Sequence, residues 1–302
     1  MVLVTGGTGF VGKILLRELI KSGEDLRLLS RRKVEGVESV ICDFKTDEIP
    51  LDSLKNIDTI FHLAGFAHDF KDASKIENIY KRINVQASVA LAELAVKNKV
   101  TNFIFVSSVK AGGSAIKGIC SSEDDQREPE GIYGKTKRDA ELKILEIGRQ
   151  SSMNVVVIRS SLVYGPKVKG NLRKMFLGIQ KGWFPPLPET GNTRSMIHVD
   201  DLVKVLLFVA KDDRTNGEIY IATDGIKYSS CQIYEILSSI SGKTTPNWKI
   251  PIFLFSFVAL LSPKIRYKVK KLLGDECYSS KKLKSLGFKS HFTLQEMNET
   301  NF

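Results

Sequence analysis

The sequence predicts an α/β fold: a doubly wound parallel sheet with helices on both faces, followed by a smaller mixed C-terminal lobe. Two observations predict it. Short apolar strand patterns alternate with amphipathic helical patterns over the first 165 residues, and beyond Pro166 the order becomes irregular, with a proline cluster in WFPPLP. Regular alternation builds a parallel sheet, and a chain of 302 residues can bury one large core with an appended lobe.

The apolar patterns place the elements in order along the chain. Each expected strand is a short apolar run, and the strands occupy residues 2–5, 26–30, 39–43, 58–65, 102–108 and 154–166. Each expected helix repeats apolar residues three and four positions apart, and the helices occupy residues 10–22, 74–98 and 133–148, the last ending at Gly148.

The stretch TGGTGFVG, residues 5–12, follows the first strand and opens the first helix. Gly6, Gly9 and Gly12 let the backbone turn tightly and approach a pyrophosphate, which the positive end of the helix dipole attracts. In this context the glycines predict a Rossmann-type site for NAD or NADP, although glycine clusters also serve ordinary turns. The other residues expected to line the turn are Thr8, Phe10 and Val11.

The change of pattern beyond the glycine turn and its sheet divides the chain into two domains. Residues 1–165 are expected to form an NAD(P)-binding Rossmann domain, to which residues 196–224 return. Residues 166–195 and 225–302 are expected to form a substrate-binding lobe.

The ends of the next two strands bear on the choice of cofactor. A ribose-binding acid is common at the end of the second strand, but this chain has Ser30 and Arg31 there. Ser30 removes repulsion toward a ribose 2′-phosphate and Arg31 can pair with it, which favours NADP; the alternative is that the arginine is merely solvated. Asp43, beside Phe44, is expected to bond the adenine amino group, unless it is a plain surface acid.

Ser108, Tyr133 and Lys137 combine groups that can transfer a proton. Tyr133 and Lys137 lie one helical turn apart, and a lysine ammonium beside a phenol is expected to lower the tyrosine pKa. Such a tyrosine can move a proton at a sugar hydroxyl or carbonyl, and Ser108 ends a strand at the ligand-binding edge of the sheet. Tyr-x-x-x-Lys alone also fits an exposed helix face, but the order of glycine turn, Ser-Ser strand and Tyr–Lys helix favours catalysis.

Further motifs accompany these residues in the same order along the chain. They are HLAG, INVQAS, FVSSVKAGG, YGKTK, VVVIRSSLVYGP and RSMIHVDDLVKVL. Together with TGGTGFVG they resemble the extended short-chain dehydrogenase/reductase family, in the NAD-dependent epimerase/dehydratase branch of UDP-glucose 4-epimerase-like nucleotide-sugar enzymes. The resemblance runs from residue 2 to about residue 300.

The resemblance implies roles for individual residues. Tyr133 would be the general acid/base, Lys137 its electrostatic partner and ribose anchor, and Ser108 the hydroxyl that orients the sugar. Arg194 would hold the substrate diphosphate through paired N–H donors, with Asn171 as a weaker candidate. The further cofactor contacts that it implies are Leu63, Ala64, Gly65 and the proton-relay residue Asn84.

The chain departs from the family pattern after the two serines of FVSSVKAGG. Lys110, Gly112 and Gly113 replace the common aromatic residue, so Lys110 is expected to contact substrate in a pocket of altered shape. This variant resembles a subgroup around O-antigen and capsule sugar synthesis. His198 and Asp201 are expected to fasten the two lobes together rather than to perform chemistry.

The resemblance leaves the reaction open. The favoured activity is a C4 epimerase of UDP-hexoses or UDP-N-acetylhexosamines, acting by transient hydride transfer with tyrosine acid/base catalysis. An NADPH-dependent 4-keto-sugar reductase needs the same three residues, and the expected preference for NADP favours it. A non-catalytic NAD(P)-sensing module is a third class, which the intact Ser108, Tyr133 and Lys137 disfavour. The expected partners are a nucleotide-diphosphate sugar and, by family analogy, a second copy in a homodimer.

Positive charge is concentrated near the C-terminus. Of the net charge of +11, most comes from residues 243–289, with eleven Lys/Arg and two acids. Within this segment, an apolar run at 251–261, too short to cross a bilayer, precedes a basic stretch. We expect residues 251–273 to cap the sugar pocket; the alternative is peripheral membrane contact. No motif supports nucleic-acid binding.

The cysteines and the first residues bear on the compartment. The four cysteines are widely scattered without C-x-x-C spacing, so neither a disulfide framework nor a metal site is expected. A strand that starts at residue 2 leaves no room for a signal peptide. A cytoplasmic protein is therefore expected, with the inner face of the membrane as its alternative place.

Overall fold

The fold is centred on a seven-stranded parallel sheet. The computed structural model describes residues 1–67, 73–129 and 131–298, and its sheet has the order β3-β2-β1-β4-β5-β6-β9. From β1 the chain winds outward first through β2 and β3, then returns and winds through β4, β5 and β6. This confirms the doubly wound prediction. The strands are β1 (Val2–Thr5), β2 (Leu26–Ser30), β3 (Glu38–Ile41), β4 (Thr59–His62), β5 (Asn102–Ser108), β6 (Asn154–Ser160) and β9 (Ile219–Ala222).

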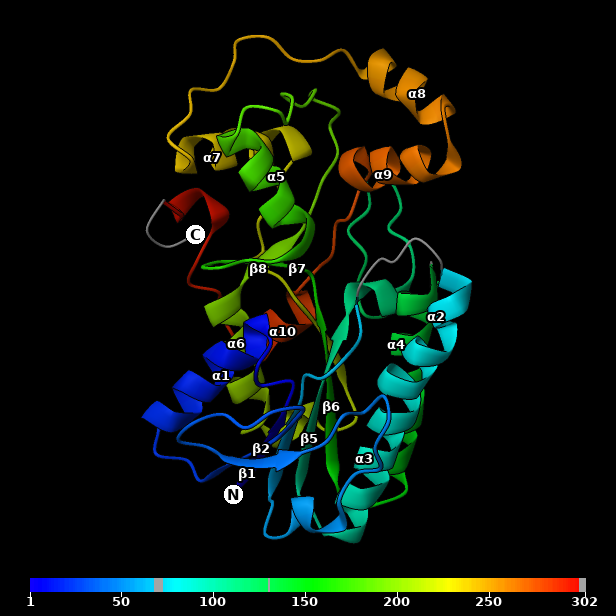
Figure 1. Ribbon diagram of the computed structural model, residues 1–302, viewed down its shortest axis with the longest axis vertical. Helices are drawn as coiled ribbons and strands as arrows, with labels where there is room; N and C mark the ends of the chain where they lie inside the picture. Colours follow the sequence, from blue (N-terminus) through cyan, green and yellow to red (C-terminus); the bar gives the residue numbers. More distant parts are fainter. Residues whose placement is uncertain (68–72, 130, 299–302) are drawn as a thin grey trace.

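Helices cover both faces of this sheet (Figure 1). On one side lie α1 (Phe10–Lys21), α6 (Val199–Val209) and α10 (Lys281–Ser285); on the other lie α2 (Ala73–Tyr80), α3 (Ala87–Lys97) and α4 (Gly131–Arg149). Successive strand residues face opposite ways, so Leu3 packs with Leu91 of α3 while Val4 packs with Leu15 of α1. The sheet is therefore buried on both faces, which explains its almost unbroken apolar strands.

A smaller lobe stands beyond the carboxyl ends of the strands (Figure 1). Its elements are the paired strands β7 (Leu162–Tyr164) and β8 (Met196–His198), with helices α5 (Gly170–Gln180), α7 (Ser230–Ile240), α8 (Ile252–Leu260) and α9 (Pro263–Leu273). Leu172 of α5 and Leu237 of α7 share its core with Tyr164. A capping box between Ser229 and Gln232 fixes the start of α7.

The end of the chain returns to the sheet. Leu283 of α10 and Phe288 belong to the same buried cluster as Leu206 of α6. This part of the C-terminal segment thus lies against the core beside the seven-stranded sheet, while α8 and α9 belong to the lobe above it.

Two predicted boundaries are wrong. Gly148 does not end its helix, because α4 continues to Arg149; a Cβ at this position would lie 2.6 Å from Cγ2 of Val155, so the glycine allows α4 to pack closely on β6. The single strand expected over residues 154–166 is two strands. β6 ends at Ser160, the chain turns, and β7 pairs with β8 in a separate sheet.

The long helical pattern at 74–98 contains a feature that its periodicity did not predict. Lys81–Gln86 form a π-helix between α2 and α3. A π-helical turn widens the helix by one residue and is common at functional sites. Here it contains Asn84, one of the predicted site residues.

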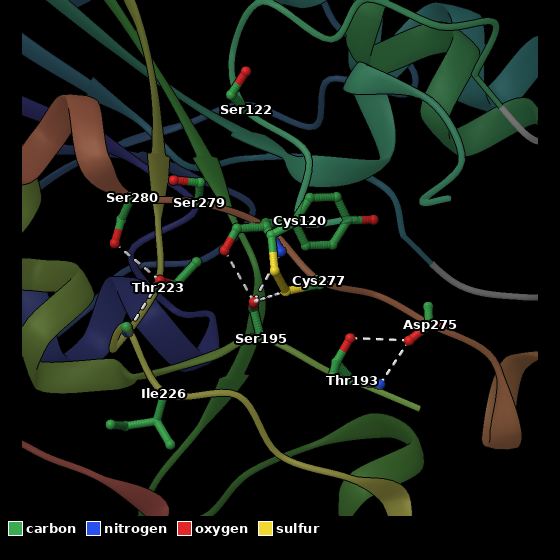
Figure 2. Close-up of a disulfide and its surroundings, with 12 residues drawn as sticks. Cys120, Ser122, Thr193, Ser195, Thr223, Ile226, Asp275, Cys277, Ser279 and Ser280 are labelled. Carbon is green, nitrogen blue, oxygen red and sulfur yellow. Dashed lines mark hydrogen bonds between the residues drawn. A yellow bond between two sulfur atoms is a disulfide. The ribbon is translucent and has the colours of Figure 1, made fainter. Parts of the chain in front are cut away.

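The expectation that the cysteines form no disulfide is also wrong. Cys120 and Cys277 are bonded across 157 residues, with their Cα atoms 4.3 Å apart (Figure 2). Their segments are paired by the backbone as well, because the N–H of Ser121 donates to the carbonyl of Cys277 at 2.9 Å. Sequence spacing could not reveal this pair, since only the tertiary fold brings the loop after β5 beside the loop after α9. Cys42 and Cys231 are free and buried.

Candidate active site

The predicted site residues converge on the carboxyl edge of the sheet. The glycine turn follows β1, residues 63–65 follow β4, Ser108 ends β5, and Tyr133 and Lys137 lie on α4. Since β2 and β4 flank β1 on opposite sides, the direction of winding reverses at β1, and sheets of this kind bind dinucleotides at such a point.

The glycine turn is shaped for a close approach of two backbones. Gly6 has φ +71°, and a Cβ there would lie 2.7 Å from the backbone nitrogen of Ala64. A Cβ on Gly12 would lie 2.6 Å from Cα of Gly7. Any side chain at either position would push α1 or residues 63–65 away from β1. These residues therefore fit a dinucleotide, because the bare backbone at the start of α1 is what a pyrophosphate needs.

A buried network that the sequence did not reveal holds the ends of β1 and β4 together. The N–H of Ala64 donates to Oγ1 of Thr5 at 3.1 Å, and this hydroxyl lies 2.6 Å from Nδ1 of His62. His62 Nε2 lies 2.8 Å from Oγ of Ser88. Burial lowers the pKa of His62 to about 3, so its ring is neutral, and one ring nitrogen donates a hydrogen bond while the other accepts one.

Asn84 fixes the chain that follows β4. It is fully buried, its Oδ1 accepts from the N–H of Phe66 at 2.7 Å, and its Nδ2 donates to the carbonyl of Phe66 and to Oγ1 of Thr136. Thr136 in turn donates to the carbonyl of Ile132. The amide thus ties the π-helix and α4 to the segment that holds Gly65.

The residues expected to choose the cofactor lie where β2 and β3 end. Ser30 is buried and its hydroxyl donates to the carbonyl of Arg32 at 2.6 Å, whereas the Arg31 side chain is exposed. Asp43 caps its own turn by accepting from the N–H of Lys45. The small Ser30 therefore shapes the turn, and Arg31 is the cation beside it that is open to a ligand.

The catalytic candidates meet as the motif order predicted, but the protonation state of the tyrosine differs. The Ser108 side chain lies close enough to Tyr133 to oppose the effect of burial, yet burial prevails and raises the pKa of Tyr133 to about 12. The expectation that Lys137 lowers it is wrong for this structure. Nζ of Lys137 donates instead to the carbonyl of Val106 at 2.7 Å and lies 3.9 Å from the centre of the Phe105 ring.

Lys137 is a buried amine, which is uncommon without a paired acid. Only 3% of the residue is exposed, and burial lowers its pKa to about 7, an effect that the Glu141 carboxylate partly opposes. An ammonium at this place is therefore poised to change its charge near neutral pH, as residues in active sites often are.

Near the site, Arg159 and Glu141 form a buried salt bridge that the sequence did not predict. Nη2 of Arg159 on β6 lies 2.6 Å from Oε2 of Glu141 on α4, and both side chains are at most 1% exposed. Arg159 also donates to Oε1 of Gln126, and a Cβ on Gly112 would lie 3.1 Å from its Nη1. The guanidinium therefore supports the turn that directly follows Ser108.

Beyond these residues a cavity of about 430 Å³ opens between α5, α7 and α9. The two predicted diphosphate ligands, Asn171 and Arg194, both line it, together with Trp183 and Phe184. Nη1 of Arg194 also donates to the carbonyl of Lys271 at 2.8 Å, which fixes the last turn of α9 against the guanidinium. Aromatic walls with converging cations suit a nucleotide base joined to phosphates.

Lys110 lies in the wall of a second cavity, of about 370 Å³, that also borders α9. Its amine forms an ion pair with Glu276, next to the disulfide. Lys271 of α9 lines both cavities, so this helix borders both spaces. To make the predicted contact with substrate, the Lys110 amine must therefore leave its ion pair with Glu276 or share its charge with it.

His198 and Asp201 lie where the strand β8 passes into α6. Oδ2 of Asp201 accepts from the N–H groups of His291 and Phe292 at 2.8 and 2.9 Å. His198 packs against the ring of Phe292, with 4.5 Å between ring centres. These contacts fasten the C-terminal segment to α6, away from the proton-transfer residues.

Comparison with known proteins gives the following similarities. The sequence model of the NAD dependent epimerase/dehydratase family matches residues 2–222. The UDP-glucose 4-epimerase of Vibrio cholerae is 31% identical over 309 residues, covering 98% of this chain and 92% of that protein. The N-acetyl-alpha-D-glucosaminyl-diphospho-ditrans,octacis-undecaprenol 4-epimerase of Escherichia coli O157:H7 is 24% identical over 314 residues, covering 98% and 92%.

Solved structures share the whole fold. MoeE5 in complex with UDP-glucuronic acid and NAD superposes with a TM-score of 0.78 at 25% identity, covering 98% of this chain and 95% of that one. A UDP-glucose 4-epimerase of Thermotoga maritima, solved with UDP-glucose, gives a TM-score of 0.79 at 22% identity with the same coverage. The second likeness shows the fold alone.

Proposed function

The chain belongs to the NAD dependent epimerase/dehydratase family, and from this premise we propose that it is a C4 epimerase of UDP-hexoses or UDP-N-acetylhexosamines. It is an NAD(P)-dependent enzyme, as its relatives are, so a non-catalytic sensing module is set aside. The 31% identity with a UDP-glucose 4-epimerase over nearly the whole chain favours this activity within the family.

The observation that carries the proposal is the meeting of Ser108, at the end of β5, with Tyr133 and Lys137 of α4 at the edge of the sheet where the glycine turn lies. In the proposed reaction, Tyr133 must be in its ionised form to take the proton from the sugar 4-hydroxyl. It later returns that proton to the 4-keto oxygen, while Ser108 orients the oxygen. A dinucleotide held at the glycine turn would supply the nicotinamide ring that exchanges a hydride with the sugar. Lys137 would bond the cofactor ribose.

The cavity with Arg194 supports a nucleotide-diphosphate as the handle of the substrate. Arg194 would bond the diphosphate by paired N–H donors, and Trp183 and Phe184 would flank the base. A cavity of about 430 Å³ falls in the range of small-molecule sites. The neighbouring cavity with Lys110 would then take part in holding the sugar.

The purified protein is expected to interconvert UDP-glucose and UDP-galactose, or their N-acetylated forms, without added cofactor, because an epimerase returns the hydride that it takes. Proton NMR of the sugar signals would follow the reaction, and denaturation of the purified protein would release its cofactor for identification. If the protein instead oxidises NADPH while it reduces a 4-keto sugar, and does not interconvert the UDP-sugars, the result would contradict the epimerase and establish the reductase.

The reductase is kept as the second candidate because of one feature, the exposed Arg31 beside the small Ser30 at the end of β2. This pair supports NADP, and a reductase must exchange a reduced cofactor in every turnover. NAD in the site of a related structure supports the other cofactor for this fold.

Arg31→Ala is expected to weaken NADP(H) binding by about ten- to a hundredfold and NAD(H) binding far less, because a charge-assisted bond to the 2′-phosphate contributes about 1.5–3 kcal/mol. Isothermal titration with both cofactors measures the difference. Arg32→Ala, which removes a neighbouring exposed cation, is the matched control. Equal losses for NAD(H) and NADP(H) would show that Arg31 does not read the phosphate.

The proposal includes a homodimer, as expected from the family. Sedimentation equilibrium of the full chain tests it directly.

A further inference from the structure

Helix α8 presents an apolar surface to solvent. None of its side chains is buried, and only Phe255 packs against the core of the lobe. Phe253, Phe257, Leu260 and Leu261 are 64%, 64%, 70% and 66% exposed. Residues spaced by three and four positions share one helix face, so these four form a single stripe, here called the α8 patch.

The next helix carries a dense positive charge. α9 packs against α8 and has no acidic residue; its described cations are Arg266, Lys268, Lys270 and Lys271, of which the first three are exposed. The two helices lie one above the other at the outer end of the lobe, far from the sheet, with α8 outermost (Figure 1). The outer end of the lobe therefore carries an apolar stripe on α8 next to a cluster of cations on α9.

The length of α8 restricts what it can do in a lipid environment. Nine residues of helix measure about 14 Å, less than half of the roughly 30 Å hydrocarbon core of a bilayer. Among the residues that the structure describes, no helix has the length and apolar character to cross a membrane. An exposed short apolar helix beside a basic one suits the boundary between headgroups and acyl chains.

We propose that α8 and α9 dock this protein on the surface of an anionic lipid bilayer. The α8 patch enters the boundary between headgroups and acyl chains, and the cations of α9 lie against anionic headgroups. Charge complementarity selects this occupant over a second copy of the chain. A symmetric contact through the same surface would bring the two basic helices together, and like charges facing each other across an interface are costly.

Docking would bring the cavities close to the lipid. Residues of α9 line both cavities, and Ile252 at the start of α8 lines the one with Lys110. The outer helix is about 10 Å thick, so the cavity walls would lie within about that distance of the headgroups. The proposal concerns where the enzyme acts, and it does not depend on which sugar or cofactor the site takes.

Flotation of the full chain with liposomes tests the proposal. The protein is expected to float with vesicles of equal phosphatidylcholine and phosphatidylglycerol, less so as salt increases, and not with phosphatidylcholine alone. The triple variant Phe253→Ser/Phe257→Ser/Leu260→Ser is expected to lower the partition coefficient at least about tenfold, because burial of each aromatic or leucine side chain is lost. Arg266→Glu is expected to weaken binding to the anionic vesicles as well.

The matched control is Leu51→Ser/Ile20→Ser, which replaces side chains that are 75% and 53% exposed on other parts of the surface. It is expected to float like the wild type. All variants should keep the wild-type melting temperature and their turnover in lipid-free solution, which excludes misfolding as the cause.

Two results would overturn the proposal. One is flotation of the wild type with anionic vesicles no greater than with neutral ones. The other is equal flotation of the wild type and the triple variant. If the wild type fails to float and sedimentation shows that the triple variant alone loses a dimer, the α8 patch is an interface between copies instead. Loss of turnover would bear only on the proposed reaction, since flotation needs no activity.

Discussion

Tyr133→Phe is expected to lower kcat for UDP-sugar epimerisation by about 10²–10⁴-fold, with a much smaller change in KM. The substitution keeps the ring and removes the hydroxyl that lies beside Ser108. If the phenol moves the proton of the sugar hydroxyl, its removal affects the chemical step rather than the binding of the nucleotide. Initial rates over a range of UDP-glucose concentrations would measure both constants.

Tyr220→Phe provides the control for this experiment. It removes the hydroxyl of Tyr220, a buried tyrosine in β9 of the sheet. Its kcat is expected to stay within about twofold of the wild type, since surface and structural changes away from the site seldom alter the transition state. Equal rates for wild type and Tyr133→Phe would remove the tyrosine from the reaction.

Glu141→Ala is expected to lower the free energy of unfolding by about 3–5 kcal/mol, because it leaves the Arg159 guanidinium buried without its counter-charge. Removal of one partner from a buried pair costs far more than the pair itself contributes, since the remaining charge keeps its desolvation penalty. Urea unfolding at constant cofactor concentration would measure the loss.

Asp139→Ala on the same helix is the matched control. Asp139 pairs with Lys143 one turn away, but both side chains are about half exposed, so the loss should be about 0.3–0.5 kcal/mol. The double variant Glu141→Leu/Arg159→Met should recover much of the stability, because neither charge then remains buried. A loss for Glu141→Ala as small as that of Asp139→Ala would show that water reaches Arg159.

The Glu141–Arg159 pair also links stability to the site. Glu141 opposes the effect of burial on the pKa of Lys137, and Arg159 supports the turn after Ser108. The two substitutions are therefore expected to affect activity and stability differently. Tyr133→Phe should alter activity and leave stability nearly unchanged, whereas Glu141→Ala should reduce both.

The sequence was informative where the signal is local. Apolar periodicity predicted the order of strands and helices, and the glycine turn and the Tyr–Lys spacing predicted which edge of the sheet holds the site. These patterns span a few residues each. The preference of alternating strands and helices for a doubly wound parallel sheet then predicts how the elements are arranged in space. The errors at Gly148 and at residues 154–166 are also local, but they arose from contacts with β6, β8 and β9 that no window of sequence contains.

By itself, then, the sequence determined the fold class, the family resemblance and the placing of Tyr133 and Lys137 on one helix. Only the tertiary structure decided the Cys120–Cys277 bond, the pairing of Lys110 with Glu276, and the raised pKa of Tyr133. The physical reason is the same in each case. Pairing across more than 150 residues and the loss of solvent around a charge depend on which distant segments pack together. The exposure of α8 is the clearest example, because an apolar run predicts burial until its neighbours in space are known.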